Sequence, residues 1–274
     1  MVVFPNAKIN LGLRITSKRN DGYHNLDTVF YPIPLFDILE VVSSTSFQFQ
    51  TSGKKIEGNQ DTNLCIKAYQ FLKKDFPQLP SINIHLHKNI PMGAGMGGGS
   101  ADGAFMIKLL NEKFQLGLND SQMSAYALQL GSDCPIFIHN KPSYATGRGE
   151  LLEEISLDLS HYYLLLVSPG IHVSTAEAFK GIQPNEGITS SKEIIRLPIN
   201  EWKDTLINDF EISVFENHPV LKSIKGKMYG LGAIYASMTG SGSTVYGLFN
   251  DAPNYKDTFD AAIETHLINP SLPK

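Results

Sequence analysis

The pattern of hydrophobic and polar positions predicts strands and helices spread along the whole chain. Stretches with strand character, through alternation or through β-branched and aromatic content, are residues 7–15, 26–31, 38–42, 81–87, 162–167, 233–238 and 244–249. Stretches with helical character, from apolar spacing or a capping residue, are 61–71, 101–109, 119–130, 175–179, most of 201–230, and 255–267. Residues 144–149 and 183–192 have the composition of turns and loops.

The strand and helix pattern restarts at residue 162, after a turn-rich segment. We therefore predict two domains, residues 1–155 and residues 156–274. A chain of 274 residues is long enough to bury a large core in one or two domains.

Composition narrows the class of protein. The formal net charge of −4 argues against a nucleic-acid partner, and 42% hydrophobic with 18% charged residues is typical of a soluble enzyme. Two cysteines are too few for a disulfide framework, and we interpret Cys134 as a small buried residue rather than a nucleophile. No apolar run reaches the ~18 residues of a membrane span, and the N-terminal residues lack the basic start and apolar core of a signal peptide. We expect a cytoplasmic protein without a membrane partner, as a monomer or a weak homodimer.

The segment with the most chemical information is a glycine loop. It contains five glycines between Gly93 and Gly99, follows the strand at 81–87 and precedes a helix. Free backbone N–H groups and the positive end of a helix dipole favour an anion, most often a phosphate. A flexible surface loop is the alternative interpretation.

Two common phosphate-binding patterns fit this loop poorly. Within the loop no lysine follows a glycine, so the Walker pattern is absent there. Gly93, Gly95 and Gly98 do match the dinucleotide pattern G-x-G-x-x-G, but a second helical segment follows where that pattern needs a strand.

The loop resembles the Pro-x-x-x-Gly-Leu-Gly-Ser-Ser-Ser-Ala motif of the GHMP kinases. Its triple glycine followed by Ser-x-Asp is most similar to the branch that phosphorylates 4-diphosphocytidyl-2-C-methyl-D-erythritol. Residues 5–13, 19–24 and 238–243 resemble further motifs of that branch, in the same order along nearly the whole chain. Ala101 stands where the branch usually has a second serine.

The resemblance implies an α+β fold of two domains. The N-terminal half would be like domain 2 of ribosomal protein S5 and the C-terminal half ferredoxin-like, with the active site in the cleft between them. The ATP-binding residues it implies are Pro91, Met92, Gly93, Ala94, Gly95, Met96, Gly97, Gly98, Gly99, Ser100 and Ala101.

The resemblance also implies a catalytic pair. An isolated Asp133 would more often cap the next turn, and an isolated Lys8 on a strand would more often face solvent. By resemblance, Asp133 is the general base and Lys8 its electrostatic partner. Ser100 could contact a phosphate or cap the helix, and we interpret Asp102 mainly as a complement of the helix dipole.

Substrate contacts follow from the same resemblance. Tyr23 would stack on a cytosine ring, His24 would bond the base edge, and Phe179 would cover the opposite face of the base. Because Tyr23 and Phe179 lie in different halves of the chain, we expect them to meet across the cleft. The branch places further substrate contacts at Asn10, Thr239 and Gly240, and adenine contacts at Asn63, Leu64 and Lys88.

The expected activity is therefore transfer of a phosphoryl group from ATP, with Mg²⁺, to the 2-hydroxyl of 4-diphosphocytidyl-2-C-methyl-D-erythritol. The nearest alternative is another GHMP kinase acting on homoserine or mevalonate, which would have no base to stack on Tyr23. A non-catalytic nucleotide-binding regulator would not need both Lys8 and Asp133. A nicotinamide oxidoreductase is disfavoured by the two successive helices after the loop.

Overall fold

A computed structural model describes residues 1–185, 187 and 189–269 of the chain. Their contacts define two units, each assembled from separate stretches of sequence. The first unit is Met1–Lys8, Pro32–Met92 and Gly97–Lys141, and the second is drawn from Ile9–Tyr31, Gly93–Met96 and Pro142–Lys274. Both units use the N-terminal half of the chain, so these units differ from two consecutive halves. The division after residue 155 concerns the order of domains along the chain and stays a prediction.

The sheet of the first unit has the strand order β1-β4-β6-β5. Its strands are β1 (Val2–Val3), β4 (Ile38–Ser44), β6 (Ser81–Lys88) and β5 (Gln48–Gly53). β4 pairs antiparallel with β1 and β6, whereas β5 and β6 are parallel. A parallel pair needs a crossover connection, and here the crossover contains the short 3₁₀ helix η1 (Gln60–Thr62) and α1 (Leu64–Asp75).

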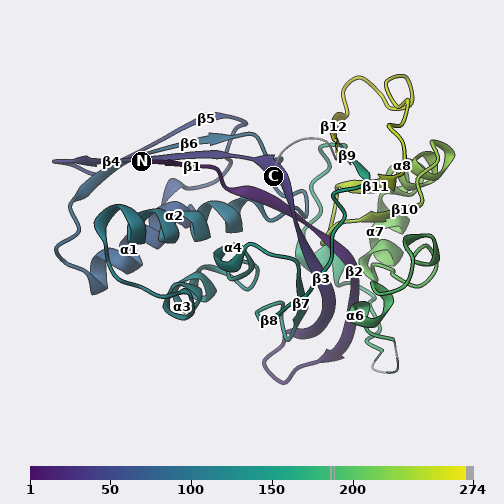
Figure 1. The fold of residues 1–274 in the computed structure, drawn as a ribbon, viewed down its shortest axis with the longest axis horizontal. Coiled ribbons are helices and arrows are strands. Elements are labelled where there is room, and N and C mark those ends of the chain that lie inside the picture. The colour runs from purple at the N-terminus through teal and green to yellow at the C-terminus, as the bar shows by residue number, and fades with distance from the viewer. Residues whose placement is uncertain (186, 188, 270–274) are drawn as a thin grey trace. The chain divides into compact units, whose positions relative to one another are not determined.

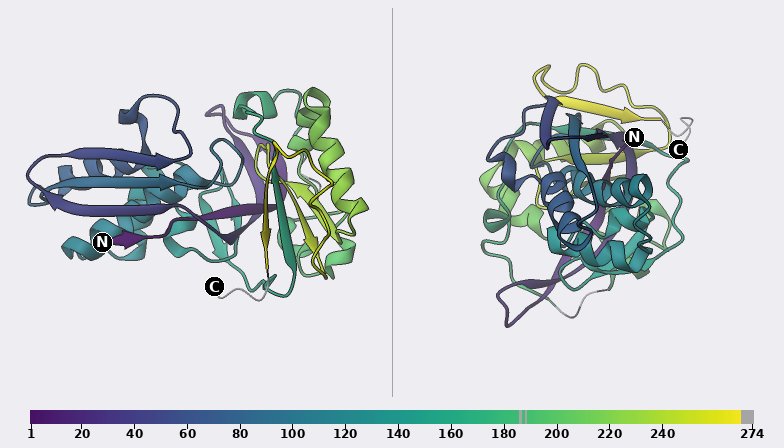
Figure 2. Two further views of the ribbon diagram at one scale, coloured as in Figure 1. Left: turned by 90° about the horizontal axis from the view of Figure 1, so that it is seen from above. Right: turned by 90° about the vertical axis from the view of Figure 1, so that its left-hand side faces the viewer.

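Helices cover one face of this sheet (Figure 1; Figure 2). They are α1, α2 (Gly98–Phe114), α3 (Asp120–Leu130) and the short α4 (Ile136–His139). The alternation predicted for residues 81–87 is confirmed, because Ile82, Ile84 and Leu86 are buried while His85 and His87 are exposed. The same alternation continues one step further and puts Lys88 on the buried face.

Capping residues begin two of these helices where the sequence predicts them. The side chain of Asn63 accepts a hydrogen bond from the backbone N–H of Cys65 at 2.9 Å and begins α1. Asn119 and Gln122 form a reciprocal capping box at the start of α3. These local polar contacts explain why both helix starts were readable from sequence.

A second sheet has the order β2-β3-β7-β8. Its strands are β2 (Asn6–Lys18), β3 (His24–Phe36), β7 (Ser143–Thr146) and β8 (Leu151–Glu154). The predicted turn-rich segment 144–149 thus begins as strand β7 and forms a turn only from residue 147. In β2 every residue from Asn6 to Leu13 is buried, so both faces of this part of the strand are covered.

The third sheet, in the second unit, has the order β10-β11-β9-β12 with every neighbouring pair antiparallel. Its strands are β9 (Tyr163–Ser168), β10 (Tyr235–Met238), β11 (Val245–Phe249) and β12 (Glu264–Ile268). In chain order this is 2-3-1-4, the strand order of a ferredoxin-like sheet. The expected ferredoxin-like C-terminal sheet is therefore confirmed.

The helical segments of the second unit lie mainly between β9 and β10. They are α5 (Thr175–Ala178), α6 (Ser191–Ile194), the 3₁₀ helix η2 (Ile199–Glu201), α7 (Phe210–Asn217) and α8 (Pro219–Gly230). α8 lies beside β10 and β11 (Figure 1), and Leu221, Ile224 and Met228 join the core of this unit. The predicted loop over 183–192 gives way to α6 at Ser191, and Glu186 and Ile188 lie outside the described residues.

The helix predicted over residues 255–267 is wrong. Residues 255–263 form turns, and 264–268 form β12, which pairs with the edge of β9. The helical spacing of Tyr255, Phe259 and Ile263 instead lets these side chains pack on the core from a turn-rich segment. Pairing with the open edge of β9 overrides the local helical pattern. Pro270, before which the helix was predicted to end, lies outside the described residues.

Two glycine loops meet within the second unit. The turn between β10 and β11 contains Thr239 and Gly240, and it packs against residues 93–96 of the first glycine loop. The backbone N–H of Thr244 donates to the carbonyl of Ala94 at 3.3 Å, and the Thr239 hydroxyl lies 3.2 Å from the carbonyl oxygen of Gly95. A Cβ on Gly95 would lie 2.0 Å from the carbonyl oxygen of Thr239, and Gly95 also has a φ of +76°. Only glycine fits this position.

We therefore predict that Gly95→Ala destabilises the protein by at least roughly 2 kcal/mol, because the new methyl group collides with backbone and the φ is unfavourable. Gly99→Ala is the matched control, since Gly99 is helical and no described atom lies within 4 Å of its Cβ position. Thermal unfolding of both variants measures the difference. Equal melting temperatures for the two variants would contradict the loop contact.

Candidate active site

The start of α2 has backbone features that favour an anion. Gly97 is its N-cap, with a φ of +70°, and no described side chain caps the helix start. The first backbone N–H that bonds back to the cap is that of Ala101, at 2.8 Å from the carbonyl of Gly97. The N–H groups of Gly98, Gly99 and Ser100 precede it and have no partner within the helix. Such N–H groups and the helix dipole favour an anion, as expected for the predicted phosphate site.

The expected ATP-binding stretch therefore divides into two parts. Residues 93–96 group with the second unit and the rest with the first. The side chains of Ala94, Met96 and Ala101 are buried, so they anchor the loop and would meet a ligand only through backbone. Gly99 has open space where a Cβ would be, which leaves room for a phosphate beside its N–H.

Lys8 and Asp133 lie together in the first unit. The Lys8 Nζ is 3.5 Å from Asp133 Oδ2, with the lysine side chain 3% exposed and the aspartate 39% exposed. Burial lowers the pKa of Lys8 below its ordinary value, and the nearby Asp133 charge opposes part of that shift. The pair thus consists of a fixed cation and a carboxylate that a hydroxyl group can reach.

The loop packs directly on this pair. The ideal Cβ position of Gly97 lies 3.2 Å from Lys8 Cε and 3.0 Å from the ring of Phe137. Pro135, and not Asp133, is the N-cap of α4, so the capping alternative for Asp133 is wrong. The structure therefore brings the predicted catalytic pair to the start of the predicted phosphate site.

The side chains of Ser100 and Cys134 form a hydrogen bond. Ser100 is the third residue of α2, so it is not the helix cap that the sequence allowed. Its hydroxyl bonds the thiol of Cys134, which is buried. Burial raises the pKa of Cys134 to about 12, so a thiolate nucleophile is disfavoured, as predicted.

A buried charge cluster that the sequence did not predict lies behind the same loop. Lys88 forms ion pairs with Asp37 and with Asp102, the latter at 2.7 Å, and all three side chains are almost fully buried. Asp37 Oδ1 also accepts hydrogen bonds from the backbone N–H groups of Asn89 and Ile90. The cluster thereby ties the end of β6 to α2.

These contacts correct two sequence-based interpretations. Asp102 is not in the first turn of α2, so it is not mainly a complement of the helix dipole. The ammonium group of Lys88 is bonded to two buried carboxylates, which disfavours a contact between this side chain and adenine. The alternation of β6 was the one available signal, since it already placed Lys88 on the buried face.

Burial and charge act in opposite directions on Asp102 and Lys88. Burial raises the pKa of Asp102 to about 8, although the Lys88 charge opposes this. Burial alone would lower the pKa of Lys88, but the two carboxylates raise it. Asp102 Oδ1 has no hydrogen-bond partner among the described residues, which is consistent with a carboxyl group that holds a proton near neutral pH.

The predicted base-binding residues lie in one unit. His24 stacks on Phe179 with ring centroids 4.6 Å apart and 19° between the planes. Tyr23 is 56% exposed, and the guanidinium carbon of Arg148 lies 5.0 Å from its ring centroid. Tyr23 and Phe179 lie in different halves of the chain, yet both belong to the second unit. Only its position between two turn glycines marked Arg148 in the sequence.

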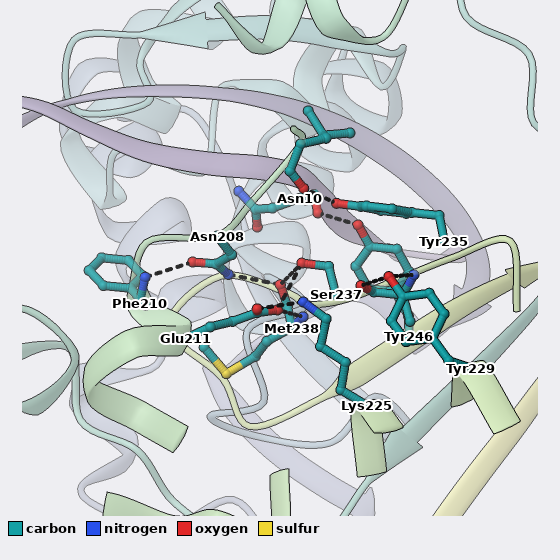
Figure 3. Close-up of polar contacts among 12 residues, drawn as sticks. Asn10, Asn208, Phe210, Glu211, Lys225, Tyr229, Tyr235, Ser237, Met238 and Tyr246 are labelled. Atoms are coloured by element: carbon teal, nitrogen blue, oxygen red, sulfur yellow. Dashed lines mark hydrogen bonds and ion pairs between the residues drawn. The ribbon is translucent and has the colours of Figure 1, made fainter. Parts of the chain in front are cut away.

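Asn10, Thr239 and Gly240 are buried in the second unit. The backbone N–H of Asn10 donates to the Thr239 hydroxyl at 3.0 Å, and the Tyr246 hydroxyl donates to the Asn10 carbonyl at 2.7 Å (Figure 3). The first bond joins β2 to the second glycine loop, and the second joins β2 to β11. The substrate contacts assigned to these residues stay predictions.

The pKa of Asp102 leads to a stability prediction. An Asp with a folded-state pKa near 8, against 3.8 when exposed, binds its proton more tightly in the folded protein. The wild type should therefore lose stability as pH rises between those values, by at most about 1.4 kcal/mol per pH unit for one proton. Asp102→Asn does not titrate, so it should gain stability relative to wild type as pH rises, levelling off above roughly pH 9.

Melting temperatures of both proteins from acid to alkaline pH measure this difference. Glu112→Gln, an exposed carboxylate on the same helix, is the control and should track the wild type. A constant difference between Asp102→Asn and wild type across this range would show that Asp102 is ionised throughout.

Comparison with known proteins agrees with this geometry. The family model described as GHMP kinases N terminal domain matches residues 63–141, and that described as GHMP kinases C terminal matches residues 196–264. A 4-diphosphocytidyl-2-C-methyl-D-erythritol kinase of Bacteroides fragilis (strain YCH46) is 55% identical over 96% of this chain and 97% of its own length. The enzyme of the same name from Cytophaga hutchinsonii is 48% identical over 92% and 94%.

Solved structures extend the comparison. A crystal structure of 4-(cytidine 5'-diphospho)-2C-methyl-D-erythritol kinase has a TM-score of 0.78 and 30% identity, with 90% of each chain covered. The mevalonate kinase of Methanococcus jannaschii has a TM-score of 0.72 with 14% identity over 97% of each chain, and shows the shared fold alone. With both family models matched and full-length relatives at such identity, the chain belongs to the GHMP kinases.

Proposed function

We propose that this kinase transfers the γ-phosphoryl group of ATP to the 2-hydroxyl of 4-diphosphocytidyl-2-C-methyl-D-erythritol. The products are ADP and the 2-phosphate of the acceptor. Relatives at 44–55% identity over nearly the whole chain are named 4-diphosphocytidyl-2-C-methyl-D-erythritol kinase. The observation that carries the proposal is the Lys8–Asp133 pair, 3.5 Å apart beside the phosphate loop.

The reaction divides between these groups. Asp133 accepts the proton of the acceptor hydroxyl as its oxygen attacks the γ-phosphorus, and the bond from that phosphorus to the β-phosphate oxygen breaks. Lys8 holds the carboxylate in position, and its charge offsets charge on the transferred group. The N–H groups of Gly98, Gly99 and Ser100 hold phosphate oxygens. Positioning and charge stabilisation are the main requirements of phosphoryl transfer.

Magnesium would enter with the nucleotide. Mg²⁺ in such sites is usually held by one or two carboxylates together with substrate phosphates and water. No group of three or more metal-binding side chains occurs among the described residues, and Asp102 is committed to Lys88. The described side chains therefore do not fit a magnesium site built by the protein alone, and we derive no step through the ion.

Acceptor choice follows from the ring cluster. Tyr23, His24 and Phe179 offer a stacking surface that a pyrimidine base can use and that homoserine or mevalonate cannot. A regulator that only binds nucleotide would have no use for a buried lysine beside a reachable carboxylate. No described helix is long and apolar enough to cross a bilayer, and we propose that the enzyme acts in the cytoplasm.

An acceptor panel tests the activity. With ATP and Mg²⁺ present, we expect ADP release with 4-diphosphocytidyl-2-C-methyl-D-erythritol and little with homoserine or mevalonate. The amount of ADP should equal the amount of phosphorylated acceptor measured by mass spectrometry. Equal or faster turnover of homoserine or mevalonate would overturn the assignment.

Asp133→Asn tests the catalytic pair. The amide keeps the shape but accepts no proton at neutral pH, so kcat should fall by roughly 10²- to 10⁴-fold. ADP affinity measured by calorimetry should stay near wild type because the loop N–H groups are untouched. Glu112→Gln is the matched carboxylate-to-amide control in the same unit. A wild-type kcat in Asp133→Asn would return Asp133 to a structural role.

A further inference from the structure

The segment just before α7 is fixed to strand β2 through its backbone. The N–H of Leu13 donates to the carbonyl of Ile207 at 3.0 Å, and the N–H of Asp209 donates to the carbonyl of Leu13 at 2.8 Å. The Asp209 carboxylate accepts a further bond from the N–H of Ile15 and pairs with Arg14 at 2.9 Å. Asn208, between these anchors, therefore has a well-defined backbone position.

The side chain of Asn208 points the other way, to the second glycine loop (Figure 3). It is 2% exposed. Its Nδ2 donates to the carbonyl of Met238 at 2.8 Å and to the carbonyl of Gly240 at 2.9 Å, and its Oδ1 accepts from the N–H of Phe210 at 3.0 Å. Both amide hydrogens are thus used on the two carbonyls that flank Thr239.

Thr239 in turn contacts two predicted site residues, Asn10 and Gly95. Its hydroxyl accepts the N–H of Asn10 at 3.0 Å and lies 3.3 Å from Asn10 Oδ1 and 3.2 Å from the carbonyl oxygen of Gly95. From the other side, Glu211 Oε1 accepts the N–H of Met238 at 2.8 Å, and Lys225 holds Glu211 Oε2 at 2.6 Å (Figure 3). Met238 is therefore held at both its N–H and its carbonyl.

We propose that Asn208 is a positioning residue for the acceptor end of the site. It acts by clamping the carbonyls on both sides of Thr239, which fixes Thr239 and Gly240 relative to Asn10 on β2. The proposal rests on the proposed function for the identity of the acceptor. The clamp needs two donors on one small side chain, so an amide is required. An aspartate of the same shape would place an oxygen against two carbonyl oxygens.

Asn208→Asp is the direct test. Measured well below the melting temperature, KM for the cytidyl acceptor should rise roughly 10- to 100-fold, the order of effect that a displacement of about 1 Å produces. KM for ATP should change by less than about 3-fold, because the phosphate-binding N–H groups belong to α2 of the first unit. Asn200→Asp in η2 adds the same charge at an exposed position of the same unit and should be silent.

A stability control separates positioning from general damage. Tyr235→Phe removes the buried bond from the Tyr235 hydroxyl to the carbonyl of Leu206 and should lower the melting temperature without changing the acceptor KM. In the double variant with Thr239→Val, the effect of Asn208→Asp on acceptor KM should be smaller than in wild type, since Asn208 acts through Thr239. Full additivity would contradict that route.

An unchanged acceptor KM in folded Asn208→Asp would overturn the proposal. If that variant does not fold, Asn208→Ser keeps one donor and should give an intermediate rise in acceptor KM, while wild-type KM in that variant would equally refute the clamp. The acceptor panel on the wild type decides the proposed function separately. Should another acceptor prove correct, its KM is the quantity to measure in the same variants.

Discussion

The backbone contact between the two glycine loops is the constraint on which the site's geometry depends most. Gly95 lies so close to Thr239 that a single methyl group would collide with the Thr239 carbonyl. This contact fixes residues 93–96 within the second unit and leaves the next glycines to begin α2. One glycine-rich stretch therefore does two different things. Its first part packs backbone against backbone, and its second part presents N–H groups to an anion.

Two buried lysines in the first unit, Lys88 and Lys8, differ in how far their acidic partners are buried, and this difference distinguishes a structural role from a proposed catalytic one. Lys88 has two partners, Asp37 and Asp102, and both are buried with it. Such a cluster is balanced internally and offers nothing to a ligand. Lys8 pairs with Asp133, whose side chain remains 39% exposed. That carboxylate can exchange a contact with Lys8 for a contact with a hydroxyl group, as a general base requires.

The sequence was most informative where the determining contacts are local. Caps at Asn63 and Asn119, the alternation of β6 and the glycine loop itself depend on residues within a few positions of one another, and all were predicted. The strand β12 could not be predicted, because it exists only through pairing with β9, about 100 residues earlier. In the Lys88 cluster, Asp102 and Asp37 lie 14 and 51 positions from Lys88 along the chain. No local sequence pattern therefore indicated that Asp37 would pair with Lys88.

In the candidate site too, contacts between residues far apart in the sequence could not be predicted from local patterns. Lys8 and Asp133 were expected together only because they matched a family, and the structure places them 3.5 Å apart. The stack of His24 on Phe179 joins residues of one unit, whereas sequence order assigned them to two domains. Strands β2 and β3 come early in the chain, yet most of their residues pack with the C-terminal half. Position along the chain was therefore a poor guide to which residues share a unit.

This assignment of residues to units bears on acceptor specificity within the family. The fold is shared with a mevalonate kinase at 14% identity and a homoserine kinase at 13%, so the fold alone does not select the acceptor. The phosphate-binding helix start and the Lys8–Asp133 pair belong to the first unit, and the ring cluster and the Asn208 clamp belong to the second. Side chains of the second unit can therefore change the acceptor while the groups that handle the phosphate stay the same. Under the proposed function, acceptor binding then rests on a few polar and aromatic contacts outside the glycine motif, and the two bonds from Asn208 to the carbonyls beside Thr239 help to position them.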